Sequence, residues 1–326
     1  LVFQSCWETS GDGTVVIGPQ LNGVVAPATK HLEAIKGSIV AAAGAPWTLL
    51  LVDLQGYYRM STTNVTGTGS RTLINSNTFT ASSSSGLLLT YTNDFNNLTK
   101  VRFSTTTTLP TGLSALTDYY LVRVSATTAR VASSLANAIA GTVIAYTDAG
   151  TGTHTMRIET RTGGVGNQAL FVSQTAPATG GPNLTASAYD NVTDTPGSGT
   201  RAFQGTPNMA AAADAYATRV LHSGNATGRY GPFLPRQGAD TGIARINSFT
   251  WSTGTAYTGS GVVALCIVKP IIEIPVSVTG MFMERDLRNK LNKIDDGACL
   301  QWMLFGTGAT TTATPIMTAL EYSWGG

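Results

Sequence analysis

The chain has 326 residues, of which 42% are hydrophobic and only 12% are charged, and its formal net charge is +2. This length is enough for one large domain or two ordinary ones. The small net charge excludes specific nucleic-acid binding as the main activity, because such binding needs an excess of positive charge to neutralise phosphates. A surface so poor in charge favours either burial in an assembly or a secreted β-sandwich.

The number of cysteines and the hydropathy of the chain narrow the class of protein further. Three cysteines are too few for a disulfide framework, and Cys266 and Cys299 stand in apolar surroundings typical of small core residues. No run approaches the roughly 18 uncharged apolar residues of a membrane helix. We therefore expect neither a disulfide-stapled fold nor a membrane association.

Short β-branched or aromatic runs separated by Gly, Pro, Asn and Asp dominate the sequence, which predicts many strands joined by turns. Residues 47–58 predict a central strand that is apolar on both faces at its start. Residues 261–268 predict another such strand, which we expect Pro270 to end. Residues 249–252 and 320–324 alternate apolar and polar side chains, as half-buried strands do.

A compact β-patterned block occupies the first half of the chain. Residues 61–85 are rich in Thr, Ser, Asn and Gly, which favours loops and exposed strands. Strands are then predicted at residues 87–92, 100–104, 119–124, 129–131, 142–146 and 153–158. A block of this size can form a small sandwich or barrel of its own. We therefore predict a domain of residues 70–158 inserted into a host domain formed by residues 1–69 and 159–326.

Pro232 and Pro235 flank two large apolar residues and force an extended segment. The following Asp-Thr-Gly at residues 240–242 predicts a turn before the next strand. Phe233 and Leu234 can therefore anchor either the core of the chain itself or a neighbouring subunit.

One amphipathic helix is predicted near the C-terminus, at residues 283–294. Its apolar positions share one face, and they are Met283, Leu287, Leu291 and Ile294. Its opposite face is basic and carries Arg285, Arg288, Lys290 and Lys293. This basic face either is solvated or contacts an acidic neighbouring subunit or nucleic acid.

The sequence offers no pattern that supports catalysis, a cofactor or a metal. Its three histidines, His31, His154 and His222, stand at no metal-ligand spacing with another His or Cys, and the Gly-x-Ser-x-Gly elbow is absent. The glycine-rich residues 163–166 lack the context of a nucleotide site and predict a turn. His154 closes a Gly/Thr turn, where a side-chain hydrogen bond is the expected role. We therefore predict that the protein is not an enzyme.

Two sets of motifs resemble phage proteins. Residues 109–122, LPTGLSALTDYYLV, and the run that ends in TDAGTGTH at residues 147–154 resemble a β module found in structural and tail proteins of tailed phages. Shorter motifs outside this block resemble a family of phage virion structural proteins, at residues 52–54, 57–58, 230–235, 240–242, 296–300 and 322–325. The resemblance covers nearly the whole chain and supplies no catalytic residues.

The expected fold is all-β, with the host domain a jelly-roll-like antiparallel β-sandwich, because its strands are many and joined by long Gly/Pro-rich connections. Together with the resemblance, this predicts a structural component of a tailed-phage virion, above all a capsid decoration or cement protein that stabilises the shell by subunit contacts. The expected partners are the major capsid protein or other virion subunits, and copies of the chain itself, with a trimer favoured.

Other functions stay open at this point. The chain could be a tail or head-tail-connector component. It could be a carbohydrate-binding adhesin, in which exposed Tyr119, Tyr120 and Trp251 stack on sugar rings. A virion glycan hydrolase has the least support, because nothing in the sequence selects a pair of catalytic carboxylates.

Overall fold

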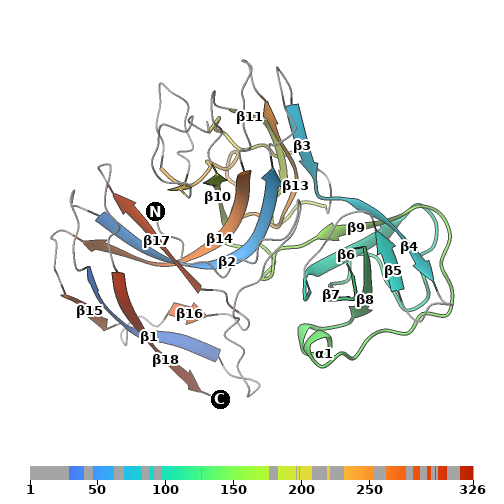
Figure 1. The fold of residues 1–326 in the computed structure, drawn as a ribbon, viewed down its shortest axis with the longest axis horizontal. Coiled ribbons are helices and arrows are strands. Elements are labelled where there is room, and N and C mark those ends of the chain that lie inside the picture. Colours follow the sequence, from blue (N-terminus) through green and yellow to red (C-terminus); the bar gives the residue numbers. More distant parts are fainter. Residues whose placement is uncertain are drawn as a thin grey trace. The chain divides into compact units, whose positions relative to one another are not determined.

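The computed structural model describes residues 29–39, 47–61, 70–82, 88–91, 97–125, 127–175, 183–195, 197, 199–207, 219–220, 231–252, 262–276, 282–286, 292–294, 298, 300–306 and 316–325. These residues are mostly in antiparallel β-strands, which confirms the prediction of a β-rich protein (Figure 1). In this part of the chain, no helix is long and apolar enough to cross a membrane. The chain divides into two compact units, one with the described residues of 29–55 and 268–325 and the other with those of 56–267.

A closed barrel of six antiparallel strands lies between residues 77 and 158, in the order β4-β5-β8-β7-β6-β9 (Figure 1). The strands are β4 (Asn77–Ser82), β5 (Leu88–Tyr91), β6 (Lys100–Thr105), β7 (Tyr119–Arg123), β8 (Thr128–Ala132) and β9 (His154–Ile158). The strands predicted at residues 87–92, 100–104, 119–124, 129–131 and 153–158 are confirmed, with each end within one residue. A short helix, α1 (Leu135–Ile139), begins after Ser134, whose hydroxyl accepts a hydrogen bond from the Asn137 N–H (3.1 Å).

Alternating side chains fill the barrel interior. The inward side chains are buried, and they are Phe79, Ala81, Leu89, Tyr91, Val101, Phe103, Tyr119, Leu121, Ala129, Val131, Met156 and Ile158. The ring of Phe103 contacts those of Phe79 and Tyr119, with centroids 5.2 and 5.5 Å apart. Thr78 and Thr80, which lie between inward positions of β4, are exposed. The period of two therefore gives each strand one face in the core and one on the surface.

The strand predicted at residues 142–146 is wrong. The Ile144 N–H donates a hydrogen bond to the Val131 carbonyl (2.7 Å), but the segment forms no ladder. Tyr146 is nevertheless buried. The β-branched pattern here belongs to an irregular segment that is hydrogen-bonded to β8 and not to a strand.

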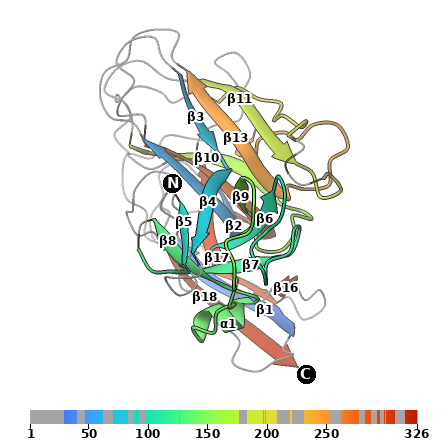
Figure 2. The same ribbon diagram turned by 90° about the vertical axis from the view of Figure 1, so that its right-hand side faces the viewer.

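The unit that contains the barrel also holds a three-stranded antiparallel sheet. Its order is β11 (Asn183–Asp190), β13 (Arg245–Ser252) and β3 (Ser70–Ile74), and Figure 2 shows the three strands side by side. In this sheet Phe249 lies opposite both Ser187 and Leu73. Residues 70–74 thus pair with β13, whereas the barrel strands begin at residue 77. The insertion of residues 70–158 as a separate domain stays a prediction.

A five-stranded sheet has the order β12-β10-β14-β2-β17. Its strands are β2 (Trp47–Ser61), β10 (Gln168–Thr175), β12 (Arg219–Val220), β14 (Val262–Val276) and β17 (Leu300–Gly306). Residues 50–58 and 263–268 are buried without alternation, which confirms that β2 and β14 are central strands. The predicted end at Pro270 is wrong, because β14 continues to Val276. The fixed φ of proline fits an extended backbone, and its missing N–H removes only one ladder bond.

The unit formed by residues 29–55 and 268–325 contains a four-stranded sheet. Its strand β1 (Thr29–Ile39) pairs on one edge with β15 (Phe282–Asp286) and β16 (Asn292–Ile294), and on the other with β18 (Ile316–Gly325). The strand predicted at residues 320–324 is therefore confirmed. The helix predicted at residues 283–294 is wrong, because the described parts of that segment are strands. Pairing with β1 outweighs the local helical spacing.

Candidate functional site

A polar site lies where the chain enters and leaves the barrel. Asn75, 2% exposed, stands between β3 and β4, and Ile158 is the last residue of β9. The Asn75 amide donates to the carbonyls of Ile158 (2.9 Å) and Ile246 (2.7 Å) and accepts from the Ile158 N–H (2.9 Å). Its backbone N–H donates to the Asn247 carbonyl (2.8 Å). One buried residue thus joins both ends of the barrel to β13.

Arg245, at the start of β13, is the centre of a buried ion cluster. Its guanidinium donates two bonds to Glu159 (Nε to Oε1 2.9 Å, Nη2 to Oε2 2.6 Å) and one to Asp190 (Nη1 to Oδ2 2.7 Å). Arg245, Glu159 and Asp190 are 2%, 6% and 0% exposed. Glu159 directly follows β9 and Asp190 ends β11. The two-pronged bond to Glu159 therefore fixes the exit of the barrel to the three-stranded sheet with defined geometry.

The two carboxylates of the cluster differ in how firmly they hold their charge. Burial raises the pKa of Glu159, and the hydrogen bonds and charge of Arg245 offset this only in part. Burial also acts on Asp190, but the N–H groups of Gly199 (3.0 Å) and Gly197 (2.6 Å), with Arg245, outweigh it and lower the pKa of Asp190. Asp190 is thus the more stable anion of the pair.

A second polar cluster holds two loops to β11. The Tyr189 hydroxyl donates to Asp240 (2.5 Å) and accepts from the Gln237 N–H (2.8 Å). Arg201 lies between Asp194 (3.2 Å) and Asp240 (3.5 Å). Burial and the bond to Asp240 raise the pKa of Tyr189 to about 12, so this phenol stays neutral and keeps its proton for the hydrogen bond. The cluster is an architectural network.

The TDAGTGTH run at residues 147–154 forms a tightly bonded loop ahead of β9. Asp148 accepts from the N–H groups of Thr111 (3.1 Å) and Gly150 (2.9 Å), and the Thr111 hydroxyl also donates to it. Gly150 has φ +68°, and a Cβ there would lie 2.5 Å from the Thr108 carbonyl oxygen. Only glycine fits this position, because both the backbone conformation and the space exclude a side chain.

His154 completes this loop. Its Nε2 lies 2.9 Å from the Ala149 carbonyl, which can only accept, so Nε2 carries a proton. Its Nδ1 bonds the Thr105 hydroxyl (2.9 Å), and its ring stacks on Phe79 with centroids 5.3 Å apart. The expectation that His154 serves a side-chain hydrogen bond is confirmed.

The pKa of the Asp148 carboxyl is expected to lie below 3.8, because the Thr111 hydroxyl and the N–H groups of Gly150 and Thr111 bond its charged form. The contribution of these Asp148 hydrogen bonds to folding stability is therefore present above the pKa of Asp148 in the unfolded chain. It is lost as the pH falls through the lower pKa of Asp148 in the folded protein. A carbon-13 NMR titration of the side-chain carboxyl measures this value. Thr111→Val should move the midpoint upward, and a wild-type midpoint at or above 3.8 would contradict the bonded loop.

The structure places the predicted subunit-contact residues in separate parts of the chain. Leu234 is 1% exposed and its N–H donates to the Ala169 carbonyl (2.8 Å), so it packs in the core of its own unit, whereas Phe233 is partly exposed. Arg285 lies in β15 opposite Ile35, and Lys293 lies in β16 opposite His31. The remaining two, Arg288 and Lys290, fall outside the described residues. The prediction that these four basic residues share one face of a helix is therefore wrong for Arg285 and Lys293, which lie in strands.

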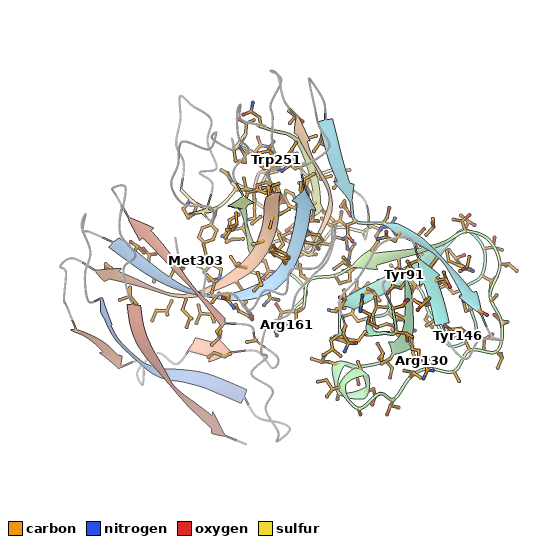
Figure 3. All side chains as sticks on the ribbon, in the orientation of Figure 1. Tyr91, Arg130, Tyr146, Arg161, Trp251 and Met303 are labelled. Carbon is orange, nitrogen blue, oxygen red and sulfur yellow. The ribbon has the colours of Figure 1, made fainter. Side chains whose placement is uncertain are left out.

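The exposed aromatic set expected for an adhesin does not form. Tyr119 is 4% exposed and lies in the barrel core, and Trp251 is 2% exposed and packs edge-on against Phe171, with centroids 4.9 Å apart (Figure 3). Each falls on the inward side of its strand. Only Tyr120 of the three is partly exposed.

The sequence did not predict the roles of four residues of the junction, Asn75, Glu159, Asp190 and Arg245. Arg245 is 86 residues from Glu159 and 55 from Asp190, so no spacing reveals their pairing. A usable signal was present nonetheless. In a chain with so few charges, Glu159, Asp190 and Arg245 each stand at or next to an end of a strand.

Fold and site together define a mostly antiparallel β protein whose six-stranded barrel is joined to a sheet by buried polar groups. Within the described ranges, no group of three or more His, Cys, Asp or Glu could hold a metal ion. Comparisons with protein-family models, with curated proteins and with solved structures find no match.

Proposed function

We propose that this chain is a structural component of a tailed-phage virion, and within that class a capsid decoration or cement protein. The observation that carries the proposal is the use made of the phage-like motif: Asp148, Gly150 and His154 hold the loop ahead of β9 together. Polar residues that hydrogen-bond one another fix the conformation of the loop, so this motif has a structural role. A structural role is what we expect in a protein that acts by packing and not by catalysis.

The buried charges support the same proposal. Arg245, Glu159 and Asp190 bond one another, so these titratable groups join the barrel to the sheet. The chain as a whole is only 12% charged, which suits a subunit whose surface is largely covered by neighbours.

The strands outside residues 70–158 form a jelly-roll-like sandwich, and residues 70–158 are the inserted domain. Three copies associate, and they bind the major capsid protein or another virion subunit in the particle. A subunit that binds the assembled shell better than the free capsomer shifts the equilibrium toward the shell.

Purified protein added to capsid shells that lack it tests this proposal. We expect co-sedimentation with the shells and an upward shift of their calorimetric disruption temperature that saturates with protein concentration. The same protein heated above its unfolding temperature and cooled serves as control if it does not refold. Folded protein that neither co-sediments nor shifts the temperature would overturn the decoration role, and binding to isolated tails alone would assign the chain to the tail.

A further inference from the structure

A row of charged side chains crosses the outer surface of the barrel. Arg157 of β9 lies directly opposite Arg102 of β6, and Arg102 forms an ion pair with Asp118, just before β7 (Nε to Oδ1 2.5 Å). Lys100, two residues before Arg102 and on the same face of β6, also reaches Asp118 (Nζ to Oδ2 2.7 Å). One carboxylate thus serves two of the three cations in this row.

Arg157 is the third cation. Among the residues that the structure describes, its guanidinium forms a hydrogen bond to the Ser104 hydroxyl (3.0 Å) and an ion pair with no carboxylate. Glu159, two residues along the chain, is engaged by both prongs of Arg245. Like charges directly opposite on neighbouring strands destabilise a sheet. An anion bound between Arg157 and Arg102 would remove that repulsion.

The row carries a local excess of positive charge. Its three cations and one carboxylate leave a surplus of two positive charges. Exposure differs along the row, because the side chains of Arg102 and Asp118 are 30% and 35% exposed, whereas that of Lys100 is 10% exposed and Arg157 is half-buried. Tyr120 lies opposite Lys100 in the β6 and β7 pair and is partly exposed.

We propose that this face of the barrel binds an acidic polysaccharide. The acid group of a sugar bonds Arg157 and Arg102, and Tyr120 supplies a neighbouring aromatic ring against which the sugar ring packs. The proposal revises the adhesin idea to a site with one aromatic residue, and it stands independently of the decoration role.

Two other classes of partner fit the row less well. Tight nucleic-acid binding uses more phosphate contacts than three cations provide. A stable protein interface needs an apolar centre. The exposed large apolar side chains in the described ranges lie outside β6, β7 and β9, and they are Leu116, Val124, Ile139 and Val165.

Isothermal titration calorimetry with alginate, a polymer of uronic acids, tests the site at low salt. Wild-type protein should bind alginate and not a neutral dextran of similar length. Arg157→Gln should weaken alginate binding about tenfold or more, because it removes a charge-assisted contact. Arg130→Gln removes the same charge from an exposed position on β8 (Figure 3) and should change the affinity by less than about twofold.

Thermal unfolding of both variants checks that they fold like the wild type. Equal losses of affinity in Arg157→Gln and Arg130→Gln, or no loss in Arg157→Gln, would overturn the site. Failure of folded wild-type protein to bind alginate would do the same. Tighter binding of polyglutamate or of single-stranded DNA than of alginate would overturn the assignment to polysaccharide.

Discussion

Arg245→Met is expected to destabilise the unit that contains the barrel by about 3–5 kcal/mol. The substitution removes the cation that Glu159 and Asp190 share and leaves two buried carboxylates without it. Burial already raises the pKa of Glu159 while Arg245 is present, so this carboxylate would be driven further toward its protonated form. Urea-induced unfolding followed by tryptophan fluorescence measures the loss.

Two variants separate the ion cluster from a general effect of substitution. Arg130→Met makes the same change at an exposed position of β8 and should stay within about 0.5 kcal/mol of the wild type. Arg245→Lys keeps the positive charge but loses the fork that bonds both oxygens of Glu159, so its stability should fall between those of the wild type and Arg245→Met. An Arg245→Met protein as stable as the wild type would show that the cluster does not hold the barrel to the sheet.

Gly150→Ala should destabilise the barrel through two effects that add. Its φ of +68° costs about 1–2 kcal/mol for a residue with a side chain. The added Cβ would also lie 2.5 Å from the Thr108 carbonyl oxygen and 2.7 Å from the Pro110 nitrogen, and overpacking of this kind costs about a further 1–3 kcal/mol. Both neighbours are backbone atoms, so neither can move aside by changing a rotamer.

Gly141→Ala is the matched control. Gly141 has a similar φ of +73°, but a Cβ there would meet nothing within 4 Å. This variant should therefore show the conformational cost of about 1–2 kcal/mol without the steric cost. Equal losses in the two variants, measured by urea unfolding, would contradict the tight packing of the loop at residues 147–154.

Much of the fold could be predicted because the long apolar runs and the alternating segments carry their own signal. Buried strands β2 and β14 follow from residues 47–58 and 261–268, and five of the six barrel strands follow from short β-branched runs. Strand β4 lies in the polar, Thr-rich stretch at residues 61–85. Threonines on its outer face alternate with the inward Phe79 and Ala81, so the strand carries only a weak apolar signal in the sequence.

The wrong predictions share a physical cause: the pairing partners available in the folded chain determine the secondary structure of short segments. Residues 283–294 have helical spacing, but β1 supplies ladder partners for residues 282–286 and 292–294. Residues 142–146 have a strand-like pattern, yet the segment forms no ladder. Local pattern cannot report which neighbours the rest of the chain provides.

The candidate site was beyond sequence reasoning for the same reason. Asn75 bonds residues 83 and 171 positions away, and nothing in its local sequence marks it as a clamp. His154 could be predicted as a hydrogen-bonding residue, because its partner Ala149 lies in the same turn. Hydrogen-bond partners that are close in the sequence can be predicted from a local motif, and distant partners cannot.

An image reconstruction of the intact virion tests whether this protein decorates the capsid. We expect density for this chain, recognisable by its six-stranded barrel, on the capsid shell in threefold clusters that repeat with the symmetry of the shell. Density for the chain confined to the tail would contradict the decoration role. Its absence from the whole particle would contradict the claim that the protein is a virion component.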